Sequence, residues 1–254
     1  MLDRRRLLLG SAALALSGCK VFDSATDRDS ALRNLFASHE GLTHAAQRAV
    51  IGDRLAPEFS ESDIRQGQRP NGSVNPEGAE YRRMAGTGFR DYRLTVTGLV
   101  DRPQSLSLAD LTALPSRTQI TRHDCVEGWS CIAKWQGVPL GTVLKLAQPK
   151  LAARYAVFQC FDAIERSLSG EVFYYESIDL IDAFHPQTIL AYGMNGAPLP
   201  VANGAPLRLR VERQLGYKMA KYVHTIELVD NLAALGSGNG SYWADRGYEW
   251  YAGI

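Results

Sequence analysis

Apolar and polar residues alternate along several short segments of this chain, a pattern typical of strands that bury one face. The alternation runs from Tyr92 to Val100 and is strict over Leu207–Val211, and Tyr222–Val229 is predicted to form a final long strand. A β-prone run at Tyr155–Cys160 predicts another strand. The helical patterns between these segments are short, unlike the regular strand–helix alternation of doubly wound sheets. We therefore predict a β-rich, mixed α+β fold in a single domain.

Helical spacing of apolar residues is confined to a few segments. It covers Ala31–Ala56 near the start of the chain and Leu140–Ala147 near its middle. A capping box of Ser107 and Asp110 predicts the start of a further short helix. One or two helical turns are expected over Ile178–Phe184. The small number of helices agrees with a β-rich fold.

Glycine, proline and asparagine mark the connections. Gln66–Gly78 is dense in these residues and predicts a loop, while Asn195-Gly196 and Asn203-Gly204 predict turns. The tail, Tyr242–Tyr251, is rich in aromatic residues and glycine, unlike a solvated terminus. We expect it to pack back onto the domain.

The first residues are predicted to form an export signal rather than part of the fold. Arg4–Arg6 give a basic start, and the apolar stretch Leu7–Leu16 is too short to span a bilayer as a helix. The arginines before the leucines resemble a twin-arginine signal, the route for proteins exported already folded. Leu16–Cys19 resembles a lipoprotein cleavage box in which Cys19 carries the lipid. A plain secretory signal with an incidental Cys19 is the alternative.

These segments divide the chain into three parts. Residues 1–18 are assigned to the signal, residues 19–65 to a polar tether and an N-terminal helix, and residues 66–254 to the main domain. The mature protein is expected on the periplasmic side of a bacterial membrane, anchored by a lipid at Cys19. Beyond Cys19 the chain keeps three cysteines, and an odd count in an oxidising compartment leaves at least one thiol free or liganded.

Composition and charge fit an ordinary globular protein. Of the 254 residues, 45% are hydrophobic and 22% are charged, enough for one substantial core. The net charge is +1, and residues 1–18 hold three arginines and one aspartate, a net +2, so the mature chain is near −1. A charge this close to zero gives no sign of nucleic acid or an anionic membrane surface as a partner.

The candidate chemistry lies in Arg122–Leu140. Cys125 follows the β-prone run Gln119–Thr121 and precedes Gly128, so we expect it where a strand ends and a loop begins. Basic surroundings favour the thiolate, the form that ligates soft metals or attacks electrophiles. A buried structural cysteine is the alternative. The basic residues close to Cys125 in the sequence are Arg122, His123 and Lys134.

Two runs in this stretch closely resemble the molybdenum-ligand segment of the sulfite oxidase family, in its bacterial methionine-sulfoxide-reductase-like branch. They are Cys-Val-Glu-Gly-Trp-Ser at Cys125–Ser130 and Trp-Gln-Gly-Val-Pro-Leu at Trp135–Leu140. The resemblance implies a sulfite-oxidase-type fold, with residues 66–254 as the molybdopterin-binding catalytic domain. It also implies a molybdenum–molybdopterin cofactor and two-electron oxygen-atom transfer on a small S- or N-oxide or a sulfite-like substrate.

By position in the motifs, the resemblance assigns roles to individual residues. Cys125 is implied to be the protein ligand of molybdenum, and Cys131 is interpreted as a packing cysteine. Asn203–Arg208 and Gly216–Lys221 resemble the segments that hold the pterin's phosphate and ring edges, while Cys160 matches a position whose backbone lies near the pterin. The implied cofactor-binding residues are Asn71, His123, Cys160, Asn203, Arg208, Met219, Ala220 and Lys221.

The residues alone support this anion site only in part. An arginine and a lysine at strand edges, beside the N–H groups of a glycine turn, can clamp a phosphate. Strand alternation by itself nevertheless favours a solvated face for Arg208 and Arg210. Only the resemblance reverses that interpretation for Arg208.

Two further candidates flank Cys125. Glu127 is a candidate catalytic acid whose pKa burial would raise, with a salt-bridged surface glutamate as the alternative. His123 is a candidate hydrogen-bond partner of the cofactor, with a satisfied core histidine as the alternative. The arginines that bind sulfite in full sulfite oxidases are not recognisable in the sequence, which counts against sulfite as the substrate.

The sequence shows no haem-binding domain and no Cys-x-x-Cys-His motif. The small-molecule reaction is therefore expected to need an external electron-transfer partner, either a membrane haem protein, a cytochrome or a quinone. A monomer is expected, since no Ig-like dimerisation domain follows. Two alternatives remain: a cofactor-free thiol enzyme using His123 and Cys125, which point to one side of an extended run, and a non-enzymatic envelope lipoprotein.

Overall fold

The computed structural model describes residues 44–50, 52–65, 67, 69–167 and 170–254. They fall into two compact units, Met1–Arg54 and Leu55–Ile254. In the first unit, residues 44–50 form a helix. The predicted helix does not continue to Ala56, because the chain turns at Gly52, where φ is 54°. The predicted signal, Cys19 and the tether lie outside the described residues.

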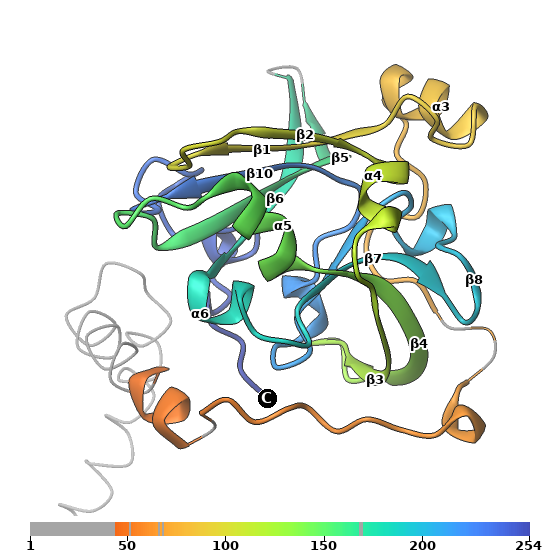
Figure 1. The fold of residues 1–254 in the computed structure, drawn as a ribbon, viewed down its shortest axis with the longest axis horizontal. Coiled ribbons are helices and arrows are strands. Elements are labelled where there is room, and N and C mark those ends of the chain that lie inside the picture. Colours follow the sequence, from red (N-terminus) through yellow and green to blue (C-terminus); the bar gives the residue numbers. More distant parts are fainter. Residues whose placement is uncertain (1–43, 51, 66, 68, 168–169) are drawn as a thin grey trace, which may run out of the picture. The chain divides into compact units, whose positions relative to one another are not determined.

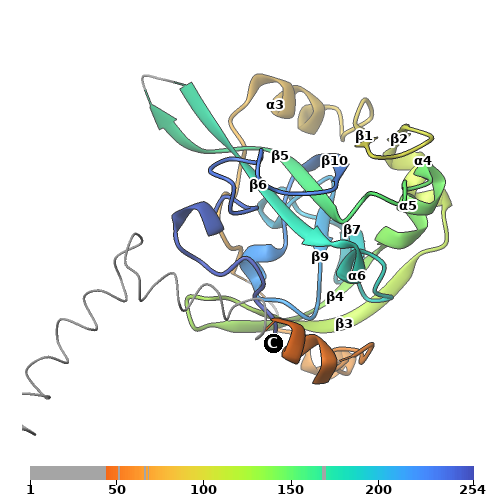
Figure 2. The same cartoon turned by 90° about the vertical axis from the view of Figure 1, so that its left-hand side faces the viewer.

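The second unit contains two five-stranded sheets, which Figures 1 and 2 show above and below its centre. In the first sheet β1 and β10 are parallel, and the other pairs are antiparallel. Its strands, in spatial order, are β2 (Gln104–Ser107), β1 (Arg93–Gly98), β10 (Val223–Val229), β5 (Tyr155–Ser167) and β6 (Gly170–Asp179).

The second sheet is antiparallel throughout. Its long hairpin of β3 and β4 curves along one side of the unit, and β9 pairs with β7 at the opposite edge (Figure 2). The strands are β3 (Arg117–Asp124), β4 (Ser130–Pro139), β7 (Ile189–Met194), β8 (Ala197–Pro198) and β9 (Arg208–Arg210). The prediction of a β-rich, mixed α+β fold is confirmed.

The helices are short and lie around and between the sheets (Figure 1). Helix α5 has the predicted bounds, Leu140–Ala147, because its fully buried apolar residues recur at helical spacing and face β4 and β1. Helix α4 (Leu108–Ala113) begins at the predicted capping box of Ser107 and Asp110. The others are α3 (Ala79–Gly86), α6 (Leu180–Ala183) and the 3-10 turns η1 (Glu61–Asp63), η2 (Val201–Asn203), η3 (Gly216–Lys218) and η4 (Ala244–Arg246). Within the described ranges, no helix is long and apolar enough to cross a membrane.

The second unit begins at Leu55 rather than at residue 66. Residues before 66 join the β3–β4 hairpin: Glu58 bridges Thr121, and the N–H of Phe59 donates to the carbonyl of Ile120 over 2.9 Å. The last part of the segment 19–65 therefore adds to the sheet edge.

Two hydrophobic clusters stabilise this unit. The larger cluster includes Leu209 of β9, whereas the smaller one surrounds Trp135 of β4. Strand β9 therefore lies between two packed layers. This position determines the surroundings of its two arginines.

Candidate active site

Cys125 lies in the tight connection between β3 and β4. Its N–H donates to the carbonyl of Trp129 over 2.9 Å, and the N–H of Gly128 donates to the carbonyl of Cys125 over 3.0 Å. Gly128 has a φ of 85°, a conformation that glycine adopts without steric cost. The predicted position of Cys125 at the end of a strand is confirmed, and its half-buried side chain lines a cavity.

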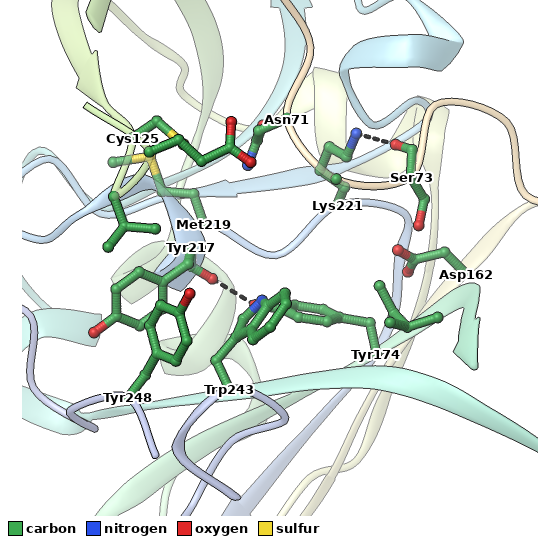
Figure 3. Close-up of a pocket in the computed structure, with 14 residues that line it drawn as sticks. Asn71, Ser73, Cys125, Asp162, Tyr174, Tyr217, Met219, Lys221, Trp243 and Tyr248 are labelled. Atoms are coloured by element: carbon green, nitrogen blue, oxygen red, sulfur yellow. Dashed lines mark hydrogen bonds between the residues drawn. The ribbon is translucent and has the colours of Figure 1, made fainter. Parts of the chain in front are cut away.

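The cavity has a volume of about 150 Å³, and segments far apart in the sequence form its wall. Figure 3 shows Cys125 on one side, Lys221 and Asp162 on the other, and a group of aromatic rings along the bottom. The lining residues are Asn71, Gly72, Ser73, Cys125, Val126, Glu127, Asp162, Ile164, Tyr174, Tyr217, Met219, Lys221, Trp243 and Tyr248.

The basic neighbours expected around the thiol are engaged elsewhere. Arg122 pairs with Asp124 at 2.8 Å, and Lys134 pairs with Glu61. Burial raises the pKa of Cys125 above its ordinary value, which backbone hydrogen bonds only partly oppose. The expectation that Arg122 and Lys134 favour the thiolate is therefore wrong for the protein alone, because these sequence neighbours on the hairpin point toward other partners.

The cationic side of the site is buried. Arg208 is 1% exposed, and its guanidinium donates to the carbonyl of Asn203 and to Oδ1 of Asn71, each over 3.1 Å. Both acceptors are neutral, and no ion pair of Arg208 with a carboxylate occurs among the described residues. Burial, with Arg210 nearby, lowers the pKa of Arg208 to about 9. The structure thus brings Asn71, Asn203 and Arg208 together.

Lys221 lies beside Arg208. Gly204, with a φ of 114°, is wedged between them: an added Cβ would lie 3.0 Å from the Lys221 stem and 3.3 Å from Cβ of Arg208. The Lys221 ammonium donates to the carbonyls of Ser73 and Ala202. Burial and repulsion by Arg208 lower the pKa of Lys221 to about 7. Two buried cations side by side are unfavourable unless an anion compensates them.

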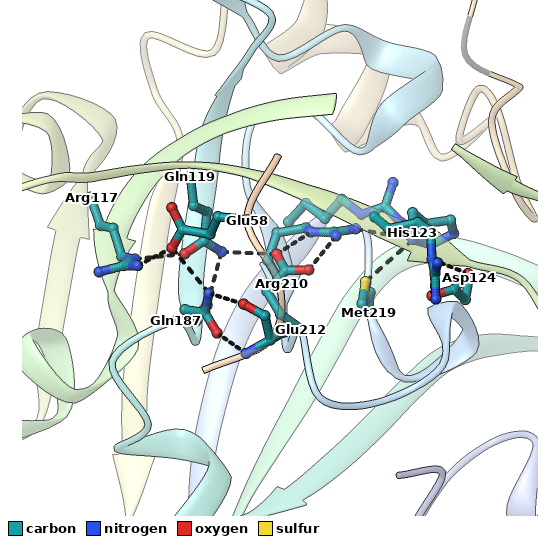
Figure 4. A network of polar contacts seen from close by, with 12 residues as sticks. Glu58, Arg117, Gln119, His123, Asp124, Gln187, Arg210, Glu212 and Met219 are labelled. Carbon is teal, nitrogen blue, oxygen red and sulfur yellow. Dashed lines mark hydrogen bonds and ion pairs between the residues drawn. The ribbon is translucent and has the colours of Figure 1, made fainter. Parts of the chain in front are cut away.

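His123 is held by a buried polar network (Figure 4). Arg210 pairs with Glu212 through two hydrogen bonds of 2.9 and 2.6 Å, and both side chains are fully buried. Another guanidinium nitrogen of Arg210 lies 3.0 Å from Nδ1 of His123. A guanidinium can only donate, so Nδ1 accepts and the imidazole proton resides on Nε2. Burial lowers the pKa of His123 well below its ordinary value, which keeps the ring neutral.

The solvated face suggested for Arg208 and Arg210 is wrong. Both guanidinium groups lie over the ring of Trp135, at 5.3 and 4.3 Å from its centroid. Leu209 faces the larger core on the other side of β9. An alternating strand pattern does not reveal that a second layer covers its polar face.

Met219 and Ala220 belong to the segment that lies against His123. The sulfur of Met219 is 3.3 Å from Nδ1 of His123, and the carbonyl of Ala220 accepts from the N–H of Leu209 over 2.8 Å. A Cβ on Gly216 would lie 2.3 Å from the His123 ring, so only glycine fits there. The segment Gly216–Lys221 therefore lies against His123 and β9, next to the residues with which the resemblance groups it.

Four buried polar atoms in this region have no hydrogen-bond partner within the part of the chain that the structure describes. They are Nε2 of His123, Nδ2 of Asn203, Nε of Arg208 and Oδ1 of Asp162. Each unpaired buried group costs about 1–3 kcal/mol, so all four are expected to be completed by a polar ligand or by bound water. Three donors beside two cations fit an anionic, phosphate-bearing cofactor, and the thiol across the cavity fits a soft metal.

Glu127, Cys131 and Cys160 do not point their side chains into the cationic cluster. Glu127 lines the cavity rim, but its side chain is 62% exposed, accepts from the Trp129 indole and lies 3.8 Å from Arg69. This matches the alternative of a salt-bridged surface glutamate. Cys131 is buried on β4 and does not line the cavity. The Cys160 side chain lies in the hydrophobic core and lines a different cavity, of about 730 Å³.

Sequence reasoning missed the aromatic wall and Asp162. Tyr174 comes from β6, a strand without a motif, and Tyr217 lies within Gly216–Lys221 but was given no role. Trp243 and Tyr248 belong to the tail that was expected to pack back. That expectation is confirmed, since the Trp250 indole donates to Oγ of Ser177 over 2.8 Å. The aromatic composition of the tail was the signal that could have located this wall.

Comparison with known proteins agrees with this geometry. Residues 83–234 match the family model described as oxidoreductase molybdopterin binding domain. The chain belongs to this family. Such membership makes the protein an oxidoreductase of the sulfite oxidase family, as the resemblance implied, and favours it over a cofactor-free thiol enzyme or a non-enzymatic lipoprotein.

Curated relatives extend the match over most of the chain. A protein of Azospira oryzae, named putative protein-methionine-sulfoxide reductase subunit YedZ1, is 35% identical over 98% of this chain and 86% of its own length. The Ralstonia nicotianae protein-methionine-sulfoxide reductase catalytic subunit MsrP is 32% identical over 91% of this chain and 70% of its own length. Its Xanthomonas campestris namesake is 38% identical over 56% of this chain and 46% of its own length.

A solved structure supports the fold. The sulfane dehydrogenase SoxCD of Paracoccus pantotrophus superposes with a TM-score of 0.50 at 24% identity, covering 56% of this chain and 39% of that one. The similarity confirms a sulfite-oxidase-type molybdopterin fold. At this identity it bears on the fold alone.

Proposed function

We propose that this oxidoreductase holds a molybdenum–molybdopterin cofactor through the Cys125 thiolate and reduces a small S-oxide by two-electron oxygen-atom transfer. One observation carries the proposal: a single cavity joins the half-buried thiol of Cys125 to Lys221, which lies beside the buried, incompletely neutralised Arg208. The relatives named methionine-sulfoxide reductases favour an S-oxide over an N-oxide or sulfite.

The chain's own residues divide the binding work. Arg208 and Lys221 attract the phosphate, and Asn71 holds the Arg208 guanidinium in place. The Nε2–H of His123 is available to donate to the cofactor. Cys125 must lose its proton to become a ligand, a step that the charge of a metal favours.

When bound, the molybdenum centre supplies a two-electron change and a position for an oxygen atom. The balanced reaction takes a sulfoxide, two electrons and two protons to a sulfide and water. The rings of Tyr174 and Trp243 exclude water from the cavity and offer an apolar surface to the carbon groups on sulfur. The electrons come from an external partner, for which a membrane haem protein, a cytochrome and a quinone are the candidates.

Metal and pterin analysis of the purified full-length protein tests this proposal. The wild type is expected to contain molybdenum and pterin and to reduce methionine sulfoxide with a reduced viologen dye as donor. Cys125→Ser should lose activity. If the wild-type protein, purified from a host that makes the cofactor, lacks molybdenum or pterin, the proposal is contradicted. A protein that contains both but acts only on N-oxides would overturn the substrate class.

We further propose export of the folded holo-protein as a monomer and its anchoring through a lipid at Cys19. The basic and apolar pattern of residues 1–18 supports this. When Arg5 and Arg6 are replaced by Lys, the active protein should stay in the cytoplasm. Cys19→Ser should instead release the active protein into the soluble periplasm. Wild-type activity in the soluble periplasmic fraction would exclude the anchor.

A further inference from the structure

A second cavity lies against the first sheet, and the function proposed above does not use it. Its volume is about 730 Å³, within the range of about 300–1,000 Å³ that is typical of small-molecule sites. Residues of β1, β10, β5 and β6 form its floor, and helix α3 borders it. The cavity is therefore large enough for a ligand of its own.

The floor of this cavity is a row of polar side chains on neighbouring strands. Residues next to them in the sequence, such as Leu94 and Phe158, are fully buried in the larger hydrophobic cluster on the other face of the sheet. The floor offers hydroxyl groups and an amide, which can hydrogen-bond the oxygen atoms of a ligand. Each member of the row pairs with the next in the strand register: Thr95, Thr225, Gln159 and Tyr175.

Aromatic rings form part of the wall. Phe161 and Phe173 line the cavity, and Phe161 packs against the ring of His224 with the centroids 4.5 Å apart. The Phe173 side chain is 46% exposed, so a ring bound in the cavity would gain contact with it. Aromatic walls above a polar floor fit a planar ring that carries oxygen atoms at its edges.

The charges at the rim favour a neutral ligand. Arg83 is paired with Asp91 at 3.4 Å, and Arg93 is paired with Asp110 at 3.6 Å. Both arginines that line the cavity already have a carboxylate partner, in contrast to Arg208 in the cationic cluster. The rim therefore has no uncompensated arginine that would attract a phosphate or a carboxylate.

The two cavities share one side chain. Tyr174 lines both of them, and its hydroxyl donates to the carbonyl of Tyr217, which holds the ring in place (Figure 3). Along β5, Phe161 lines the second cavity and the next residue, Asp162, lines the Cys125 cavity. A molecule in the second cavity is thus separated from the Cys125 cavity by a thin wall of β5 and β6.

The reaction proposed above needs two electrons from outside while the S-oxide occupies the Cys125 cavity. We propose that the second cavity binds a quinol, whose electrons cross the Tyr174 wall to the molybdenum site, an inference that rests on the proposed function. A quinol is a neutral planar ring with hydroxyl groups at two opposite edges, as the floor, walls and rim require.

The electron transfer is balanced. The two O–H bonds of the quinol break as it becomes a quinone, which releases two electrons and two protons. The electrons cleave the S–O bond of the S-oxide, and the protons pass to solvent, from which two protons are taken up to convert the released oxygen into water. One quinol and one S-oxide therefore give one quinone, one sulfide and one water.

The activity test uses the full-length holo-protein with a dimethyl-naphthoquinol, in which methyl groups block the ring carbons that thiols attack. Methionine sulfoxide reduction is measured with this quinol and separately with the reduced viologen dye. Thr95→Phe fills the floor of the cavity and should lower quinol-driven turnover about tenfold or more, with dye-driven turnover unchanged. Thr97→Phe is the matched control, because Thr97 lies on the same face of β1 but does not line the cavity.

Binding is measured independently of turnover, by equilibrium dialysis of the oxidised naphthoquinone against each holo-protein. The wild type and Thr97→Phe should bind it equally, whereas Thr95→Phe and Phe173→Ala should bind it about tenfold more weakly or worse. Phe173→Ala removes an exposed ring and decides the question if Thr95→Phe fails to fold. Its control is Val172→Ala, at a neighbouring exposed position that does not line the cavity.

The outcomes separate the two proposals. A wild type that does not reduce the S-oxide with the dye contradicts the proposed function. A dye-active wild type that neither binds the quinone nor uses the quinol overturns the second site alone. Quinol-driven turnover that survives in both Thr95→Phe and Phe173→Ala does the same. Turnover with a reduced haem protein but not with the quinol would also overturn the quinol as the donor.

Discussion

Two arginines on one face of β9 are expected to respond in opposite ways to replacement by methionine. Arg208→Met removes a buried cation that hydrogen-bonds only neutral acceptors, whereas Arg210→Met removes the partner of the buried Glu212. Methionine keeps most of the side-chain length and its contact with Trp135. The comparison therefore isolates the effect of charge at two neighbouring positions.

The change in unfolding free energy expected for Arg208→Met follows from the surroundings of Arg208. With a pKa of about 9, the Arg208 guanidinium binds its proton more than a thousandfold more weakly than an exposed arginine does. This corresponds to about 4–5 kcal/mol against the charged form. A base with a lowered pKa carries this penalty in full below the folded-state value, so it applies at pH 7 and is relieved only above about pH 9. The bonds to Asn203 and Asn71 return about 1–2 kcal/mol each. We therefore expect Arg208→Met to leave the unfolding free energy of the apo-protein unchanged or raise it by up to about 3 kcal/mol.

For Arg210 the balance is reversed, because its loss leaves Glu212 buried without a cation. Breaking a buried pair in this way costs about 3–5 kcal/mol. Thermal unfolding of the apo-proteins at neutral pH measures both variants, with an expected fall in Tm of about 10 °C for Arg210→Met. Arg208→Met should instead lose pterin when it is produced with the cofactor. Equal destabilisation of the two variants, or full pterin content in Arg208→Met, would refute this reasoning.

Other variants test separate parts of the account. Cys125→Ser should abolish S-oxide reduction while Cys131→Ser leaves it largely intact, since of these two cysteines Cys125 lines the cavity. If turnover assays show the reverse, Cys125 is not the metal ligand. Pterin retention should decrease as the pH rises through about 7, because Lys221 is charged below its pKa of about 7 and neutral above it. Lys221→Arg should flatten that dependence, and a flat wild-type profile would remove Lys221 from the site. Ser107→Ala should lower the unfolding free energy by about 0.5–2 kcal/mol through loss of the α4 cap, and an unchanged Tm would show that the cap contributes nothing.

Local features of this fold could be predicted from the sequence because nearby residues determine them. The bounds of α5 follow from the spacing of its apolar residues, and the capping box fixes the start of α4. The end of β3 at Asp124 placed Cys125 in a loop. Most residues of the cationic cluster were found, but only through motif resemblance.

Features that depend on distant segments could not be predicted. Strand β6 was not predicted, because its own sequence shows no strand pattern and pairing with β5 stabilises it. The burial of Arg208 and Arg210 depends on Trp135, from a strand that does not adjoin β9. Asp162 reaches the cavity through an irregularity in pairing, which no spacing in the sequence reveals.

The most direct test of the central claim is X-ray absorption at the molybdenum edge of the native protein, compared with Cys125→Ser. The wild type is expected to hold one molybdenum per chain, and the metal in the variant is expected to have one sulfur ligand fewer. A wild type without molybdenum, or an unchanged sulfur shell in Cys125→Ser, would contradict the central claim.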